Sequence, residues 1–167
     1  RELSIALGVP EEDVRRTIPY PVQNRPGWSD FFGVPLRDIH RIVKHRRVSP
    51  RWLTQSLHLK AIWSVKVFSF DPRTKEQLLD MCPECHRRPT YLRTYGVQYC
   101  EFCSVLNDLG DRQGRIDFRD YPQPIIEVSD IEALDFVTGL VDPETADCTG
   151  IRGLHTELRE LGRSVVF

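Results

Sequence analysis

The sequence has no run of about 18 consecutive apolar residues, so it predicts no membrane-spanning helix. It also lacks a charged and then apolar start of the signal-peptide type. Only five cysteines are present, and four of them form two close pairs, unlike the denser framework of a disulfide-rich secreted domain. These absences predict a cytoplasmic protein in a reducing compartment, with no membrane partner.

Several catalytic motifs are absent as well. The sequence contains no G-x-S-x-G, P-loop, G-x-G-x-x-G or H-E-x-x-H pattern, and its acidic C-terminal part has no carboxylate pair at a distinctive spacing. We therefore expect a protein that is not an enzyme. The 40% hydrophobic and 28% charged residues are the balance of a globular protein, and 167 residues suit one ordinary domain or two small ones.

The most specific pattern that is present is a pair of C-x-x-C motifs in residues 81–103, MCPECHRRPTYLRTYGVQYCEFC. The 14 residues between the motifs are close to the usual spacing of a four-thiolate zinc site. Four thiolates close the coordination sphere, whereas a catalytic zinc keeps one position open for water. The fifth cysteine, Cys148, is expected to be an ordinary small side chain. The sequence thus predicts a structural zinc whose ligands are Cys82, Cys85, Cys100 and Cys103. It also predicts a zinc ribbon, with a hairpin between the two motifs.

The net charge of −1 conceals an asymmetry along the chain. Residues 37–75 contain ten Lys or Arg against two Asp, a net +8, and residues 104–167 contain thirteen Asp or Glu against six Arg, a net −7. Such a division favours a basic surface for a polyanion and an acidic region for another partner, although solvated helix surfaces would carry the same charges. The candidate nucleic-acid-binding residues are Arg41, Lys44, Arg46, Arg47, Arg51 and Lys60 in the basic segment, and Arg87, Arg88 and Arg93 in the ribbon.

Glycine and proline punctuate the basic part of the chain. Two segments, ALGVPEEDVRR (6–16) and FFGVPLRDIHR (31–41), repeat Gly-Val-Pro at an offset of 25 residues. Because the glycine can end one helix and the proline can begin the next, each predicts a helix-turn-helix-like step, and an ordinary helical hairpin would share the pattern. Ser49–Pro50 and Asp71–Pro72 predict two more capped helix starts.

The C-terminal part carries two further helical patterns. The segment SDIEALDFVTGLV (129–141) begins with a Ser129–Glu132 capping box, and GIRGLHTELRELG (150–162) has a second apolar stripe. The polar segment ahead of them is a predicted linker. We therefore predict a mostly α fold with a small β zinc ribbon, in four regions: a basic helical region (1–80), the ribbon (81–104), a linker (105–124) and an acidic helical region (125–167).

The order of these features resembles the TniQ family of transposition proteins, which includes TnsD-type target selectors. The likeness covers residues 28–146, and its most specific segments are FSFDPRTKEQLLDMCPEC, RTYGVQYCEFC and ALDFVTGLVDP. The four paired cysteines match the metal positions of the family. The resemblance implies a non-catalytic transposon component that binds DNA or a guide-RNA effector complex at the insertion site and recruits an AAA+ ATPase.

Two alternatives fit the same residues. One is a stand-alone transcription regulator of helix-turn-helix and zinc-ribbon type, which would leave a specific footprint on duplex DNA. The other is a protein–protein adaptor that uses the ribbon and the acidic helices, and it would show no salt-dependent binding to nucleic acid.

Overall fold

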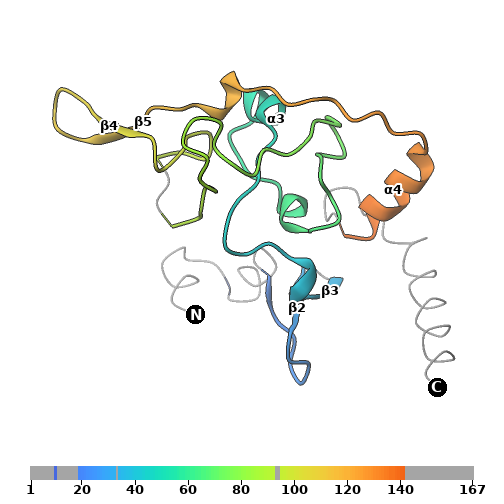
Figure 1. The fold of residues 1–167 in the computed structure, drawn as a ribbon. Coiled ribbons are helices and arrows are strands. Elements are labelled where there is room, and N and C mark those ends of the chain that lie inside the picture. Colours follow the sequence, from blue (N-terminus) through green and yellow to red (C-terminus); the bar gives the residue numbers. More distant parts are fainter. Residues whose placement is uncertain (1–9, 11–18, 33, 93–94, 142–167) are drawn as a thin grey trace, which may run out of the picture. The chain divides into compact units, whose positions relative to one another are not determined.

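The computed structural model describes residues 10, 19–32, 34–92 and 95–141 (Figure 1). Its contacts divide it into two units. One unit combines the chain up to Asp38 with the chain from Asp130 onward. The other, which we call the central unit, is Ile39–Ser129. The predicted basic region is therefore divided between the two units, and its later part shares the central unit with all four paired cysteines.

A three-stranded antiparallel sheet precedes the central unit. Its strands lie in the order β1 (Tyr20–Pro21), β2 (Trp28–Phe31) and β3 (Val34–Arg37). Strand β2 buries every second side chain, Ser29 and Phe31, which is the period-two burial of a strand. Its last residue, Phe31, pairs with Val34, the first residue of β3.

This hairpin corrects the helix-turn-helix prediction for residues 31–41. The Gly-Val-Pro segment leads into β3 rather than into a helix, and only a short 3-10 helix, Asp38–His40, follows. The prediction relied on the glycine and proline alone, and the apolar-polar-polar-apolar order of Trp-Ser-Asp-Phe just before them carries no alternation that would have indicated a strand. The related segment 6–16 lies outside the described residues, apart from Pro10.

Helix α4 (Ile131–Gly139) belongs to the same unit as this sheet, and it confirms the predicted helix in residues 129–141. Its N-cap is Asp130 rather than Ser129, because the Asp130 carboxylate accepts a hydrogen bond from the Ala133 amide at 2.8 Å. The apolar stripe that the sequence predicts for this helix, Ile131, Leu134, Val137, Leu140 and Val141, is not fully buried, since Ile131 and Val137 remain exposed. The second predicted helix, 150–162, lies outside the described residues.

Helix α3 (Pro50–Gln55) begins where the sequence predicts. The Ser49 hydroxyl caps it by accepting a hydrogen bond from the Trp52 amide at 3.1 Å, and Pro50 occupies the first helical position. After the 3-10 helix Ala61–Ser64, the described residues of the central unit form no further α-helix, and the 3-10 helix Phe118–Asp120 packs against α3. The buried apolar side chains of this unit include Val48, Trp52, Leu53, Ile62, Trp63, Val65, Phe68, Leu78 and Phe118.

The predicted helix at Asp71–Pro72 is wrong, because the chain turns there instead. The Asp71 carboxylate accepts from the Thr74 amide, as an N-cap would, but Lys75 then takes a positive φ of 57°. The Asp71 amide donates to the Glu76 carbonyl at 2.8 Å, so the segment reverses direction. A carboxylate followed by proline is thus compatible with a turn as well as with a helix start.

The second sheet also lies elsewhere than predicted. Strands β4 (Ser104–Leu106) and β5 (Arg112–Gly114) form an antiparallel hairpin inside the predicted linker, whereas the described residues between the C-x-x-C motifs form no strand. The Asn107 side chain accepts from the Leu109 and Asp111 amides, and Gly110 has a φ of 81°, so residues 107–111 make the turn.

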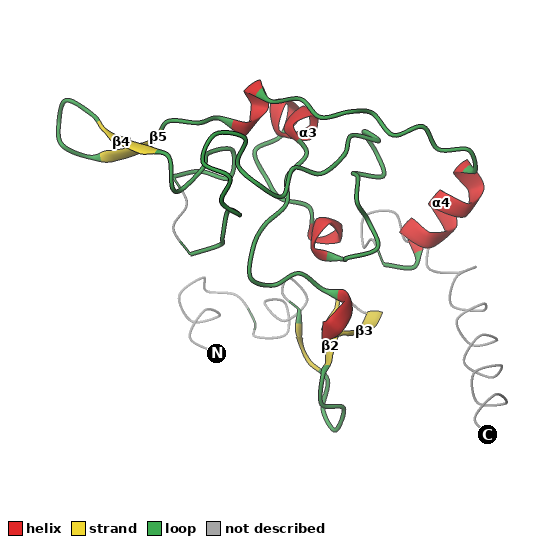
Figure 2. Ribbon diagram, viewed as in Figure 1, coloured by secondary structure: helices red, strands yellow, loops and turns green. Residues whose placement is uncertain are grey.

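These findings contradict the mostly α fold class. The described residues contain two α-helices, three short 3-10 helices and two small antiparallel sheets, joined by long loops (Figure 2). Two of the predicted helix starts, in residues 31–41 and at Asp71–Pro72, are a strand and a turn instead.

Candidate metal centre

The first C-x-x-C motif forms a tight turn in the central unit. The Cys82 amide donates to the Arg87 carbonyl at 2.9 Å, and the His86 amide donates to the Cys82 carbonyl at 3.0 Å. His86 adopts a positive φ of 55° to complete this turn. The backbone itself therefore holds Cys82 and Cys85 on one side of the turn, and His86 serves the turn through its backbone.

The second motif is attached to the base of the β4–β5 hairpin. The Cys100 amide donates to the Ile116 carbonyl at 3.0 Å, and the Arg115 amide donates to the Cys103 carbonyl at 2.8 Å. The segment that follows β5 is thus hydrogen-bonded to both ends of the second motif, and β4 continues directly from Cys103. The hairpin of this module follows the second motif instead of lying between the motifs.

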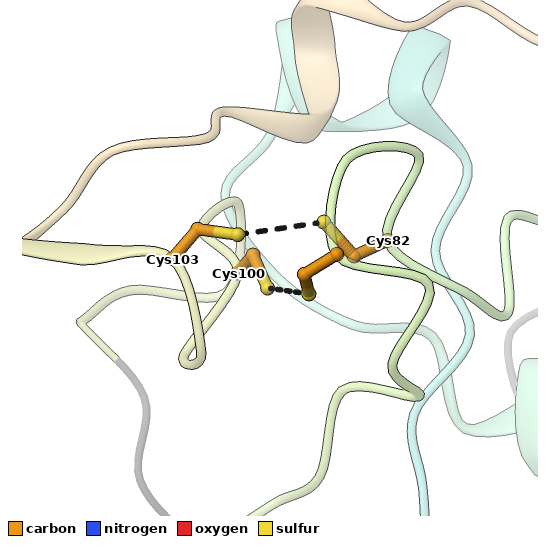
Figure 3. A group of neighbouring side chains, drawn as sticks. Cys82, Cys100 and Cys103 are labelled. Carbon is orange, nitrogen blue, oxygen red and sulfur yellow. Dashed lines mark hydrogen bonds between the residues drawn. The ribbon is translucent and has the colours of Figure 1, made fainter.

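The four sulfur atoms converge on one point. Figure 3 shows the Cys82 side chain facing Cys103 from the opposite loop, and the Sγ–Sγ distance of this pair is 3.9 Å. Cys85 and Cys100 are 3.7 Å apart, and all four sulfurs lie within 4.8 Å of one another. These distances are far longer than a disulfide bond of about 2.05 Å. The structure therefore brings together all four predicted ligands, in an arrangement that could hold a metal ion.

The surroundings of the thiols differ between the four positions. Burial raises the pKa of Cys100 to about 11, and burial also raises the pKa of Cys103. For Cys85, burial is outweighed by hydrogen bonds, first of all with the Arg87 backbone, and the pKa is lowered. Since metals bind thiolates, loading of this centre must displace protons from the thiols whose pKa is raised.

Three of the predicted nucleic-acid-binding residues are buried. Arg46, Arg47 and Lys60 are 1%, 9% and 9% exposed. Arg47 donates to the carbonyl oxygens of Trp63, Val65 and Phe68, so it organises the loop after α3. These three side chains are internal parts of the central unit, and in this structure they offer no charge to a phosphate.

Four of the other candidates are exposed. The Arg46 amide donates to the Pro89 carbonyl at 2.8 Å, which brings the segment beginning at Lys44 beside Arg87 and Arg88. We call Lys44, Arg87 and Arg88 the exposed basic surface. Arg51 is also exposed but lies on α3, Arg41 is half-buried, and Arg93 lies outside the described residues.

The exposed basic surface includes an aromatic ring and one acidic neighbour. The Arg87 guanidinium lies 5.2 Å from the centroid of the Phe102 ring, and Phe102 is 41% exposed. Arg88 is 3.7 Å from the Asp80 carboxylate, with both side chains largely in water, so this ion pair is weak. The surface could therefore contact a polyanion, and Phe102 could stack on a base.

No protein-family model and no curated protein matches this chain. Among the described residues, no helix is both long and apolar enough to cross a membrane.

Proposed function

We propose that the four cysteines bind one zinc ion and that this zinc is structural. A tetrahedron of sulfurs about 2.3 Å from zinc has edges of about 3.8 Å, which matches the separations of 3.9 and 3.7 Å within the two pairs. Four thiolates leave no position for a substrate or a reactive water. Two loops that carry little regular structure would be held together by the metal.

We further propose that the protein is a non-catalytic transposition protein. It helps to select the insertion target, as DNA or as a guide-RNA effector complex, and it recruits an AAA+ ATPase. The resemblance of residues 28–146 to the TniQ family supports this role. The observation that carries the nucleic-acid part is the grouping of Lys44, Arg87 and Arg88 beside the four-cysteine centre, from segments about 40 residues apart.

The two alternatives now differ in support. A transcription regulator would read DNA with a helix-turn-helix, but the described part of residues 31–41 consists of the end of β2, strand β3 and a short 3-10 helix, so that role would depend on residues 6–16. A protein–protein adaptor is favoured by one observation, the exposed apolar side chains of α4: Ile131, Phe136 and Val137. We keep the adaptor as the second candidate.

The salt dependence of duplex DNA binding tests the proposed role. Each phosphate that a Lys or Arg neutralises adds about 0.9 to the slope of log affinity against log salt. The double variant Lys44→Gln/Arg88→Gln should therefore flatten the slope by about two units, as measured by fluorescence anisotropy between about 50 and 200 mM salt.

A control variant removes the same charge from another unit. Arg25→Gln/Arg37→Gln changes two exposed arginines of the β1–β3 unit and should leave the slope unchanged. An equal flattening in both variants would mean diffuse attraction rather than a defined surface. An unchanged slope in Lys44→Gln/Arg88→Gln would mean that the exposed basic surface makes no contact with DNA phosphates, and it would favour the adaptor.

A further inference from the structure

Arg46 is a buried cation beside the four-cysteine centre. Its side chain is 1% exposed, and its Nη2 donates to the Tyr99 carbonyl at 2.5 Å. That carbonyl belongs to the peptide bond that leads into Cys100. The guanidinium therefore lies one peptide unit from a predicted metal ligand, although the two residues are 54 positions apart in the sequence.

The backbone around Arg46 is also tied to the first C-x-x-C motif. The Arg46 amide donates to the Pro89 carbonyl at 2.8 Å, and Val48 exchanges two hydrogen bonds with Leu79, at 3.0 and 2.8 Å. Leu79 precedes the first motif and Pro89 follows it. Residues 46–48 are thus attached to both ends of the first motif and, through the Arg46 side chain, to the start of the second.

Arg46 has hydrogen-bonding capacity that its neighbours do not use. Its Nε and Nη1 are buried and have no partner among the described residues, whereas the guanidinium of the adjacent Arg47 is bonded to carbonyl oxygens by all three nitrogens. A buried cation is costly unless a negative charge lies near it. Burial lowers the pKa of Arg46, and the negative charges of Glu101 and, when it is ionised, of Cys100 oppose this lowering.

Glu101 alone is an incomplete partner for Arg46. One of its carboxylate oxygens accepts from the Thr90 hydroxyl at 2.7 Å, and the other is buried without a partner among the described residues. No ion pair joins Glu101 and Arg46 directly within the described residues. Four thiolates around a divalent metal carry a net charge of about −2, so a loaded centre provides the larger counter-charge.

We infer that Arg46 is the internal counter-cation of the four-cysteine centre. Its charge offsets the negative charge of the loaded thiolates, and its hydrogen bonds to the Tyr99 and Pro89 carbonyls attach it to the segments next to both C-x-x-C motifs. This inference depends on the metal binding proposed above. It assigns Arg46 a positioning and charge-balancing role in place of the nucleic-acid contact that the sequence predicted.

Zinc affinity of the full chain, measured by competition with a chromophoric chelator, tests this role. Arg46→Gln should bind zinc about 10–100-fold more weakly, which is the usual effect of removing a partner of a metal ligand. Arg46→Lys keeps the charge and should stay within about threefold of the wild type. Arg88→Gln is the matched control, since it removes an exposed arginine near the same motif, and it should also stay within about threefold.

A variant at Glu101 tests the charge argument independently and remains informative if Arg46→Gln does not fold. Glu101→Gln removes a negative charge beside the centre, so zinc binding should become about threefold tighter or more. Unchanged or weaker binding in Glu101→Gln would overturn the charge-balancing role.

The remaining outcomes separate this inference from the proposed metal centre. Wild-type affinity in Arg46→Gln would overturn the inference and leave the zinc centre standing. Equal weakening in Arg46→Gln and Arg46→Lys would overturn the charge-balancing role, because the geometry of the guanidinium hydrogen bond to Tyr99 rather than the charge would then matter. A wild-type chain that binds neither zinc nor cobalt would reject the metal centre itself, and the inference with it.

Discussion

At the scale of single residues, the central unit depends on a buried ion pair. The Lys60 ammonium lies 3.1 Å from the Asp71 carboxylate, and their side chains are 7% and 0% exposed. Burial alone would raise the pKa of Asp71, but hydrogen bonds from the Trp63 indole and the Thr74 amide, with the charge of Lys60, outweigh it and lower that pKa. This contribution to stability is complete above about pH 3.9 and is lost as the pH falls through the folded pKa.

We expect Asp71→Ala to destabilise the central unit by about 3–5 kcal/mol, because it leaves the Lys60 charge buried without its partner. Urea unfolding at constant zinc, followed by tryptophan fluorescence, measures this change, since Trp52 and Trp63 both lie in this unit. Asp80→Ala breaks the exposed pair with Arg88 and should cost about 0–1 kcal/mol. Equal costs for the two variants would show that burial of the Lys60–Asp71 pair has no energetic consequence.

At the scale of elements, the four-cysteine module consists of a tight turn and a hairpin that pack little apolar surface of their own. The strands β4 and β5 are three residues each, and their Val105 and Leu106 side chains are exposed. Such elements are marginal in water without a further constraint. A structural zinc would supply the missing free energy, since values of about 10–16 kcal/mol are typical of small zinc-binding peptides.

We therefore expect one zinc per chain, bound by four thiolates. Elemental analysis of the purified protein should find about one equivalent, and Cys100→Ser should lose the metal together with the hairpin signals in NMR spectra. Cys148→Ser is the matched control and should keep both. A stoichiometry near two, or loss of zinc in Cys148→Ser, would contradict the assignment of the four paired cysteines as the only ligand set.

The elements also show which features could be predicted from the sequence. Three predictions are confirmed: the four paired cysteines come together, Ser49 caps α3, and residues 129–141 contain a helix. Each relies on a short pattern of residues that lie close together in the sequence. The hairpin lies outside its predicted segment. The sequence order in which Tyr91, Arg93 and Tyr95 alternate with Leu92 and Thr94 predicts strands between the motifs, whereas Asn107 and Gly110 fall in the predicted linker.

Burial of charged residues could not be read from sequence spacing. Arg46, Arg47 and Lys60 look like solvated cations in a basic segment, and only partners 11 to 53 residues away explain their burial. Glu76 is a similar case, because its fully buried carboxylate accepts from the Ser49 hydroxyl, the Arg51 amide and the Gln123 amide. One feature of the sequence could have indicated a buried charge near the cysteines: Glu101 directly follows Cys100, so a carboxylate stands next to a predicted metal ligand.

At the scale of the whole molecule, the charge asymmetry does not follow the predicted regions. Residues 123–126 belong to the central unit, where the Gln77 amide donates to the Pro124 carbonyl and the Ile126 amide donates to the Lys75 carbonyl, both within 2.9 Å. The first residues of the predicted acidic region are thus attached to the basic segment. The described acidic helix, α4, lies instead in the other unit, so the exposed basic surface and α4 belong to different units.

Because the exposed basic surface and α4 belong to different units, each could bind a partner of its own. On the proposed function, the exposed basic surface contacts nucleic acid, and α4 presents Glu132 and Asp135 to the recruited AAA+ ATPase. Both side chains are exposed, and they lie beside the exposed apolar Phe136. Opposite charges across such a contact mainly accelerate and orient the encounter, while the apolar side chains contribute affinity.

We expect the charge reversal Glu132→Lys/Asp135→Lys in the full chain to lower the association rate with the ATPase by at least about tenfold at low salt, with zinc content and DNA affinity unchanged. Surface plasmon resonance with immobilised ATPase measures this rate. Asp108→Lys/Asp111→Lys reverses two exposed acids at the β4–β5 turn and should change the rate little, because the same change in net charge lies in the other unit. Equal slowing by both variants would mean that the association rate depends on the net charge of the chain and not on α4. An unchanged rate in the α4 variant would place the ATPase contact on another surface.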